Sequence, residues 1–203
     1  MAENEKKISK KTLNKSFNLW FWGALTCFSQ EHMQTFGYLS SMLPIIKELY
    51  PDKKEQQEKI HAYTAFFNTN PMLGSVIIGT TASMEEARAN GKGIDGETIN
   101  DMRAGLMGPI AGIGDSLIDG TLIPILLGLA LGMSQNGSPV GAIFYIIVWD
   151  LIAYFGQRFL YFRGYKLGDK AVSILVGKQG KAIRHAISII GGMGVGGVLA
   201  SWV

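Results

Sequence analysis

Two carboxylates inside an apolar, glycine-rich stretch are the residues best suited to chemistry. Asp115 and Asp119 both fall within residues 112–121. A carboxylate within a membrane costs at least about 2.5 kcal/mol on insertion scales and is by default functional. Carboxylates also accept hydrogen bonds from adjacent hydroxyl groups, which is how proteins hold sugars. Asp115 is therefore the strongest candidate for a sugar contact, and capping of a half-helix together with Ser116 is the structural alternative.

The spacing of the two carboxylates depends on the backbone between them. Asp119 follows Asp115 by four residues, so a continuous helix would place both on one face, whereas a broken helix would not. Paired carboxylates suggest acid–base work, but glycosidase chemistry needs a soluble cleft and finds no support here. The glycine pairs at 177–180 and 112–114 lack the spacing and flanking strand of a phosphate-binding loop. We expect no catalytic residue and no cofactor in this chain.

Amide and hydroxyl side chains form a second candidate group at Asn68, Thr69 and Asn70. Pro71 biases Asn70 away from helical dihedrals, so the chain should break there and could turn these side chains toward a cavity. Asparagine before proline also often makes a turn that bonds its own backbone. Both interpretations remain open.

A third polar group interrupts an otherwise charge-free stretch that runs from residue 16 to residue 46. It contains Gln30, Glu31, His32 and Gln34. A buried polar group needs a partner. These side chains could contact a sugar, the segment around Pro71, or another subunit.

Several other classes of site are disfavoured. His32, His61 and His185 show no spacing typical of a metal site, so we expect no metal. His185 lies among basic residues and could accept a phosphoryl group, but a solvated or lipid-facing cation is the favoured interpretation. The net charge of +3 would fit nucleic-acid binding, yet the basic residues lie beside apolar segments without interleaved aromatic residues, so we expect no nucleic acid.

The distribution of charge along the chain indicates a membrane protein. Hydrophobic residues make up 47% of the 203 residues, which is ordinary for a globular protein. Charged residues nevertheless cluster into blocks and leave four long intervals without Asp, Glu, Lys or Arg, at 16–30, 60–84, 120–149 and 186–203. A soluble helix would show a polar face in these intervals, so the sequence predicts an all-α integral membrane protein.

Residues 1–50 form the first of three regions, and the chain from Ile8 to about Tyr50 should be helical. An apolar stripe follows a lysine-rich start and contains Leu13, Phe17, Trp20, Phe21, Ala24 and Phe28. This pattern favours an amphipathic helix at the membrane interface. A secretory signal peptide is disfavoured because no small-residue cleavage motif follows in register.

Residues 51–103 form the second region, which begins with a charged, solvated stretch at 51–59. Pro71 divides the apolar interval at 60–84 into halves that are each shorter than the roughly 20 residues that span a bilayer, so we expect a re-entrant helical hairpin. Residues 85–103 are polar and contain the turn pair Asn90-Gly91, so they belong in water.

Residues 104–203 form the third region and should hold the spanning helices, of which we expect about three. Residues 104–133 are interrupted by glycine and proline, which predicts a broken membrane helix or a second hairpin, as transporters use near the midplane. Residues 140–162 and 186–203 should span, joined by a basic loop at 163–185 that the positive-inside rule places in the cytoplasm. The N-terminus is then cytoplasmic and the uncharged turn at 134–139 external.

Five short motifs follow one another in a recognisable order. They are Met33-Gln34 leading to Met42-Leu43-Pro44, then Phe66-Phe67-Asn68-Thr69-Asn70-Pro71, then Glu85-Glu86 with Arg88-Ala89-Asn90-Gly91, then Gly105-Leu106-Met107-Gly108-Pro109, and finally Ala111-Gly112-Ile113-Gly114-Asp115. In this order and spacing, the chain resembles the IID membrane component of mannose-family bacterial sugar phosphotransferase systems. Members of that family usually run longer, so a further C-terminal part is expected beyond Val203.

The resemblance implies a IIC membrane partner of related but inverted architecture, with a sugar site between the two subunits in the bacterial inner membrane. Cytoplasmic IIA and IIB domains would pass a phosphoryl group to the sugar, and the IID chain itself would not be phosphorylated. A homotrimer of IIC–IID pairs is implied too, and some members also act as bacteriocin receptors. The rival hypotheses are a subunit of an ion-coupled secondary transporter that uses Asp115, and a membrane scaffold without a transport role.

Overall fold

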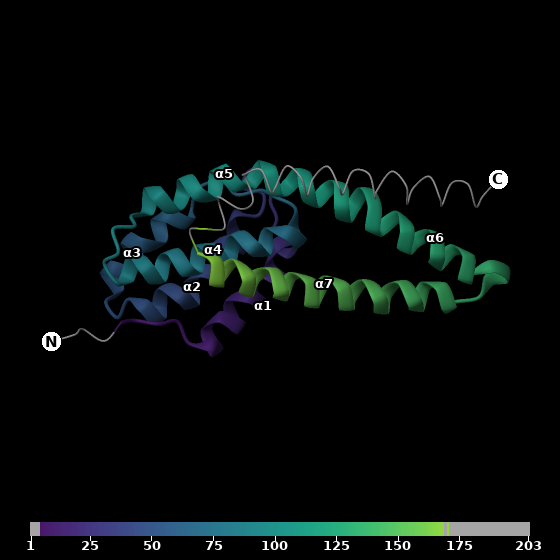
Figure 1. The fold of residues 1–203 in the computed structure, drawn as a ribbon, viewed down its shortest axis with the longest axis horizontal. Coiled ribbons are helices and arrows are strands. Elements are labelled where there is room, and N and C mark those ends of the chain that lie inside the picture. The colour runs from purple at the N-terminus through teal and green to yellow at the C-terminus, as the bar shows by residue number, and fades with distance from the viewer. Residues whose placement is uncertain (1–4, 169, 171–203) are drawn as a thin grey trace.

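The computed structural model describes residues 5–168 and 170, and within them it contains helices but no β-strands (Figure 1). The helices are α1 (Lys10–Thr26), α2 (Thr35–Leu49), α3 (Lys53–Ile60), α4 (Pro71–Ala89), α5 (Gly96–Gly114), α6 (Ile123–Met133) and α7 (Val140–Leu167). A π-helical segment, η2 (Asp115–Leu122), joins α5 to α6, and short 3-10 turns, η1 (His61–Tyr63) and η3 (Gln135–Gly137), complete the path.

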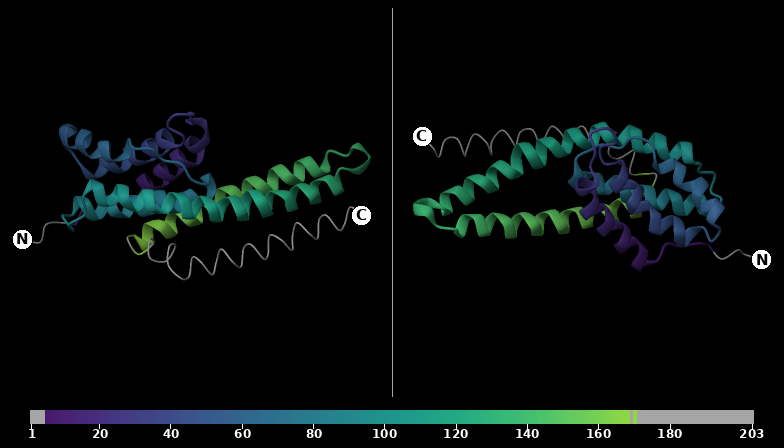
Figure 2. Two further views of the ribbon diagram at one scale, coloured as in Figure 1. Left: turned by 90° about the horizontal axis from the view of Figure 1, so that it is seen from above. Right: turned by 180° about the vertical axis from the view of Figure 1, so that it is seen from behind.

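The molecule consists of a helical body and a projecting hairpin. Helices α1 to α4 form the body with the start of α5 and the end of α7, while α6 and the first part of α7 extend away from it as antiparallel neighbours (Figures 1 and 2). The tip of the hairpin is the predicted uncharged turn, where Gly137 adopts a φ of +77° that suits glycine.

Two helical stretches are long and apolar enough to cross a membrane, Gly96–Met133 and Val140–Leu167. Only 22% and 17% of their most apolar windows are buried inside the protein, whereas the core helix of a soluble protein would be mostly buried. The predicted spanning helix at 140–162 is confirmed as the apolar part of α7. The third predicted span and most of the basic loop at 163–185 lie outside the described residues.

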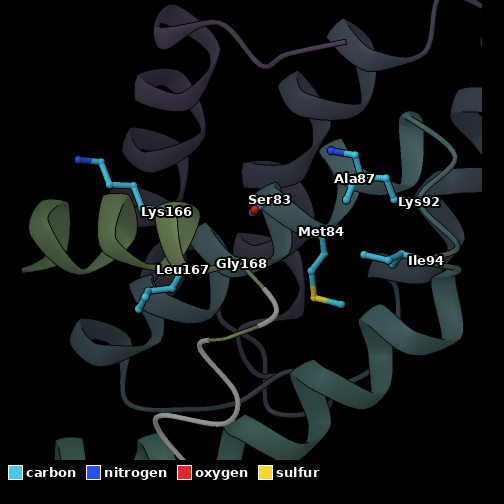
Figure 3. A pocket seen from close by; sticks show the side chains of 8 residues that line it. All are labelled: Ser83, Met84, Ala87, Lys92, Ile94, Lys166, Leu167 and Gly168. Carbon is cyan, nitrogen blue, oxygen red and sulfur yellow. The ribbon is translucent and has the colours of Figure 1, made fainter. Parts of the chain in front are cut away.

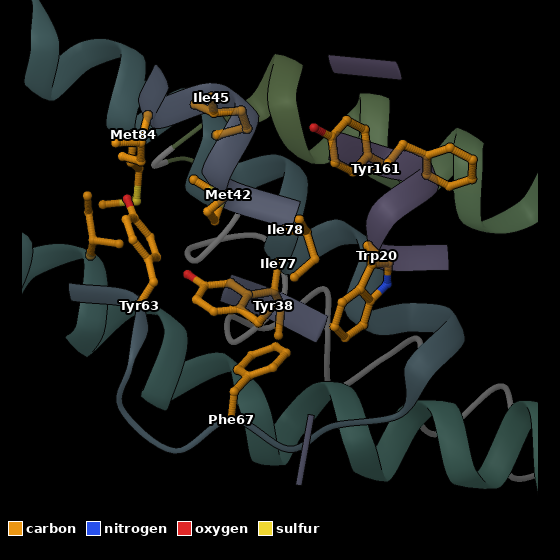
Figure 4. Close-up of a cluster of buried hydrophobic side chains, with 14 of the residues drawn as sticks. Trp20, Tyr38, Met42, Ile45, Tyr63, Phe67, Ile77, Ile78, Met84 and Tyr161 are labelled. Carbon is orange, nitrogen blue, oxygen red and sulfur yellow. The ribbon is translucent and has the colours of Figure 1, made fainter. Parts of the chain in front are cut away.

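The body is built around aromatic side chains that are fully buried, among them Trp20, Tyr38, Tyr63 and Tyr161 (Figure 4). Most of the apolar stripe of α1 belongs to this core and packs against α2, α4 and α7, which corrects the expectation that the stripe faces lipid. The opposite face of α1 carries Trp22, which is 69% exposed.

The expected helix over residues 8–50 is interrupted at 27–34. Ser29 and Met33 form an isolated bridge there, and Met33 pairs in parallel with Phe67, so backbone pairing replaces helix. Met33 has a φ of 49°, which a regular helix does not allow.

The expected break within residues 104–133 does not occur, because η2 keeps the path helical from Gly96 to Met133. A π-helical turn bonds each residue to the fifth one along, and π-turns occur mostly inside α-helices and often at functional sites. Pro124 lies directly after η2, at the start of α6, and does not end this helical path.

The predicted break at Asn70-Pro71 is confirmed, since Pro71 begins α4. The preceding arm differs from the expected helical hairpin, because residues 64–70 are non-helical and only α4 forms a long helix. The three-region division at 1–50, 51–103 and 104–203 stays a prediction.

Candidate functional site

The side chain of Asn70 connects three segments of the fold. Its Oδ1 atom accepts hydrogen bonds from the backbone N–H groups of Met72 at 3.1 Å and Leu73 at 3.2 Å, which caps α4. Its Nδ2 atom donates to Asp115 Oδ1 at 3.1 Å and to Asp119 Oδ2 at 3.0 Å. The amide oxygen of Asn70 therefore caps the start of α4, and its amide nitrogen holds the two carboxylates together.

The continuous helical path through η2 explains how two carboxylates reach one amide. Residues four apart lie on the same face of a helix, and both Asp115 and Asp119 are exposed there, while Ile118 and Thr121 are buried. Gly114 makes the approach of Asn70 possible, because a Cβ atom at this position would overlap the Asn70 side chain. The Asn70–Asp115–Asp119 cluster thus depends on the helical backbone of η2 and on the absence of a side chain at Gly114.

The segment before Asn70 is fixed by Gln34, which is buried. Gln34 Nε2 donates to the Thr69 carbonyl oxygen at 2.9 Å, and Gln34 Oε1 accepts from the Thr69 N–H at 3.1 Å. The Thr69 hydroxyl in turn donates to the carbonyl oxygen of Met107 at 3.0 Å. Gln34 and Thr69 therefore fix the chain immediately before Asn70, and with it the position of the Asn70–Asp115–Asp119 cluster.

A cavity of about 330 Å³ opens beside this cluster, between α1, α4, η2 and α7. Its lining residues are Phe21, Trp22, Leu25, Thr26, Asn70, Pro71, Met72, Ile118, Asp119, Trp149, Asp150, Ala153 and Gln157. The set combines carboxylates and amides with aromatic faces, and its size lies at the lower end of the range for small-molecule sites. These groups can accept hydrogen bonds from hydroxyls and pack against a sugar ring. We call this space the central cavity.

The predicted site residues divide into those that the structure brings together and those that it leaves apart. Asn70 and Asp115 meet, with Gln34 and Thr69 behind them. The exposed Ser116 donates its hydroxyl to the Gly112 carbonyl oxygen at 2.8 Å, a bond within its own helix. Among the predicted site residues only Asn70 lines the central cavity. The part of every predicted residue in binding stays a prediction, and the others do not line the cavity: Asp115, Ser116, Asn68, Thr69, Gln34, Glu31 and His32.

Three lining residues of α7 were missed by the sequence reasoning. They are Trp149, Asp150 and Gln157, none of which is among the site residues predicted from the sequence. Arg158, on the same helix, donates from Nη2 to Asn14 Oδ1 at 2.8 Å. The spacing of Trp149 and Gln157, eight residues apart on one helix, would have placed both on the same face. What the sequence does not show is which face of α7 turns toward Asn70.

A second buried polar cluster surrounds Glu85 in α4, away from the central cavity. Its carboxylate accepts hydrogen bonds from the hydroxyls of Tyr50 and Tyr63, and Arg88 lies 3.5 Å from it. Burial, followed by the nearby carboxylate, raises the pKa of both tyrosines above its ordinary value. Protonated hydroxyls of this kind satisfy the buried carboxylate, which gives the cluster a structural role.

Another cavity, of about 340 Å³, lies between the C-terminal ends of α4 and α7 (Figure 3). Its lining residues are Ser83, Met84, Ala87, Lys92, Ile94, Lys166, Leu167 and Gly168. Its described lining contains neither a carboxylate nor a side-chain amide, and among the lining side chains only the Ser83 hydroxyl offers an oxygen acceptor.

Comparison with known proteins places these features in a family. Residues 7–203 match the family described as "PTS system mannose/fructose/sorbose family IID component". The fructose permease IID component of Bacillus subtilis is 34% identical over 204 residues, an alignment that covers 98% of this chain and 72% of that protein. The mannose-specific EIID component of Escherichia coli K12 is also 34% identical, over 98% of this chain and 70% of its own length.

Solved structures agree with the sequence relatives. A cryo-EM structure of the mannose transporter ManYZ in complex with microcin E492 has a chain that is 32% identical to this one, with a TM-score of 0.76 over 98% of this chain and 73% of that one. A second structure, described as a membrane protein, is 31% identical with a TM-score of 0.87 over 98% of this chain and 72% of that one. The chain therefore belongs to the mannose/fructose/sorbose family of phosphotransferase-system IID components.

Proposed function

We propose that this IID component forms, together with a IIC subunit, the sugar-binding and translocation unit of a phosphoenolpyruvate-dependent phosphotransferase system. The observation that supports the proposal is Asn70, whose amide holds Asp115 beside Asp119, and both Asn70 and Asp119 line the central cavity. Carboxylates oriented in this way can accept hydrogen bonds from two sugar hydroxyls, and Trp149 supplies an aromatic face nearby.

The exposure of the carboxylates supports a site that is shared with the partner. Asp115 and Asp119 are exposed in the isolated chain although they lie within a segment apolar enough to cross a membrane. Charged groups at such depth face a protein interior or a water-filled cavity. A IIC subunit against η2 would complete the cavity wall and shield both carboxylates from lipid.

The chemical step belongs to other subunits in this proposal. The IID chain binds the sugar and offers it on the cytoplasmic side, where phospho-IIB donates the phosphoryl group received from IIA. Three IIC–IID pairs would assemble as a trimer. Binding of a bacteriocin to the complex is a further proposal, which the ManYZ relative in complex with microcin E492 supports.

The orientation that we propose places the N-terminus in the cytoplasm and the hairpin tip outside, in the bacterial inner membrane. Fourteen residues separate Asp119 from Met133 at the tip, and a helix rises about 1.5 Å per residue, so the cluster lies roughly 21 Å from the tip. In a hydrocarbon core of about 30 Å, this depth is in the cytoplasmic half. A sugar held there would be close to the side on which IIB works.

Sugar uptake tests the site. We expect Asp119→Asn and Asp115→Asn, expressed with the IIC partner, each to reduce phosphoenolpyruvate-dependent uptake at least about tenfold, because loss of a charge-assisted hydrogen bond costs about 1.5–3 kcal/mol. Asp101→Asn is the matched control, since Asp101 is exposed on α5 and does not line the central cavity. Asn68→Ala tests whether its exposed side chain takes part.

The outcome separates the hypotheses. Normal uptake in both η2 variants, with normal amounts of folded complex, would exclude these carboxylates from the site. Uptake that persists without this chain would support a scaffold role. Uptake that depends on an ion gradient but not on phosphoenolpyruvate would support the secondary transporter.

A further inference from the structure

A stripe of aromatic and basic side chains runs along the outer face of α7. It lines a groove of about 400 Å³ and consists of Phe155, Arg158, Phe159, Phe162, Arg163 and Lys166. The spacing of these residues follows the three- and four-residue period of one helical face. The stripe is separate from the central cavity, with which it shares no lining residue.

Two of the three basic groups of this stripe lie over aromatic rings. The Arg158 guanidinium lies 4.9 Å from the centre of the Phe162 ring and donates to Asn14 Oδ1 at 2.8 Å. The Arg163 guanidinium lies 5.4 Å from the centre of the Phe159 ring. No acidic side chain is among the groove's described lining residues, so the positive charge is not neutralised within it.

The apolar end of the stripe lies nearer to the hairpin tip than the basic end does. Phe155 and Phe159 are each 60% exposed, at about 22 Å and 28 Å from Val140 at a rise of about 1.5 Å per residue. Arg163 and Lys166 follow at about 34 Å and 39 Å. With the tip at one membrane surface and a hydrocarbon core of about 30 Å, the phenylalanines lie among acyl chains and the last two cations at headgroup level.

We propose that this stripe binds an anionic phospholipid of the cytoplasmic leaflet. Arg163 and Lys166 would contact the headgroup phosphate, and Phe155 and Phe159 would contact an acyl chain. Charge complementarity and the order of apolar and basic groups along α7 favour a lipid, because a free phosphate has no apolar part that could contact the exposed phenylalanines. Basic pockets on the cytoplasmic side of membrane proteins bind such headgroups. The inference depends on the proposed orientation of the hairpin but not on sugar binding.

Native mass spectrometry of the complex with its IIC partner tests the proposal, with phosphatidylglycerol in phosphatidylcholine nanodiscs as the probe. Each cation near a membrane surface contributes about fivefold in affinity. Arg163→Gln with Lys166→Gln should therefore weaken phosphatidylglycerol retention about 25-fold. The matched control is Lys53→Gln with Lys54→Gln, which removes the same charge from exposed positions on α3.

Unchanged retention in the α7 double variant, or an equal loss in the α3 control, would overturn the proposal. Inorganic phosphate could instead displace the lipid and protect the complex against thermal unfolding as well as the lipid does. That result would show that the site binds a free anion, and it would also overturn the proposal. If the double variant fails to fold, Lys166→Gln alone changes one exposed side chain and should weaken retention about fivefold. Unchanged retention in that single variant would equally overturn the proposal.

Discussion

At the scale of single residues, the sequence predicted what depends on local chemistry and missed what depends on distant contacts. Proline restricts the residue before it, so the break at Asn70 could be predicted from two adjacent letters. The same two residues do not reveal that the Asn70 side chain donates a hydrogen bond to Asp115, which is 45 residues away. Asp115 itself could be singled out because a carboxylate in an apolar stretch is costly wherever it lies. Its partner is set by tertiary packing.

Gly114 offers the sharpest residue-scale prediction. Gly114→Ala puts a methyl group where the Asn70 side chain lies, so either η2 or Asn70 must move. We expect a loss of about 1–3 kcal/mol in stability, as for other overpacked sites, with reduced sugar uptake because the two carboxylates lose their shared donor. Thermal unfolding of the purified chain and uptake in cells measure the two effects.

Gly112→Ala is the control for Gly114→Ala, because it lies on the same helix and no atom is within 4 Å of the added methyl group. Alanine favours a helix over glycine by about 0.5–1 kcal/mol, so this variant should be as stable as the native chain or slightly more so. Equal behaviour of the two variants would show that the contact between Gly114 and Asn70 does not matter.

At the scale of elements, apolar length predicted α7 well, while the interruptions near Asp115 were misleading. Glycine and proline usually end helices, and from these signals residues 104–133 were expected to break. The segment stays helical because its irregularity is absorbed by the π-helical turn η2, where the Thr121 hydroxyl donates to the Ser116 carbonyl oxygen at 2.8 Å. A one-dimensional pattern does not distinguish a π-turn from a break. The helix predicted over residues 8–50 is interrupted for a related reason, since Met33 pairs with Phe67 from another segment.

Helices α4 and α7 run parallel in close contact, which anchors the hairpin to the body. Met72 approaches Gly156 near the start of the contact, and Ser83 approaches Gly168 near its end. Between them, a Cβ atom at Gly79 would overlap the Tyr161 backbone, and one at Gly164 would overlap the Val76 backbone. Small residues of this kind let membrane helices approach each other closely.

Gly164→Ala tests this element contact. The added methyl group meets rigid backbone rather than a flexible side chain, so we expect the two helices to separate and the chain to lose roughly 1–3 kcal/mol. Gly105→Ala is the control, because its side is open. The midpoint of thermal unfolding in detergent should fall for Gly164→Ala only. An unchanged midpoint would mean that this contact does not hold the hairpin to the body.

At the scale of the whole molecule, charge distribution predicted a membrane protein but not its shape. The charge-free intervals identified the apolar helices, since a bilayer imposes the same requirement on every spanning segment. The same reasoning assigned the α1 stripe to lipid, whereas α2, α4 and α7 cover most of it. An apolar face indicates burial without naming what buries it. The separation into a body and a projecting hairpin follows from contacts between distant segments, which the pattern along the chain does not contain.

The orientation of the molecule leads to the last prediction. Cysteine is placed at the exposed positions Gln135, at the hairpin tip, and Lys54, on α3, each in a Cys27→Ala background that removes the sole native thiol. A membrane-impermeant maleimide added to intact cells should label Gln135→Cys, and it should label Lys54→Cys only after permeabilisation. The reason is electrostatic, because basic segments flanking spanning helices are retained in the cytoplasm. The opposite labelling would place the Asn70–Asp115–Asp119 cluster in the outer half of the membrane and the α7 stripe in the outer leaflet. The cluster would then bind sugar that arrives from outside, and it would not lie on the side where phospho-IIB works.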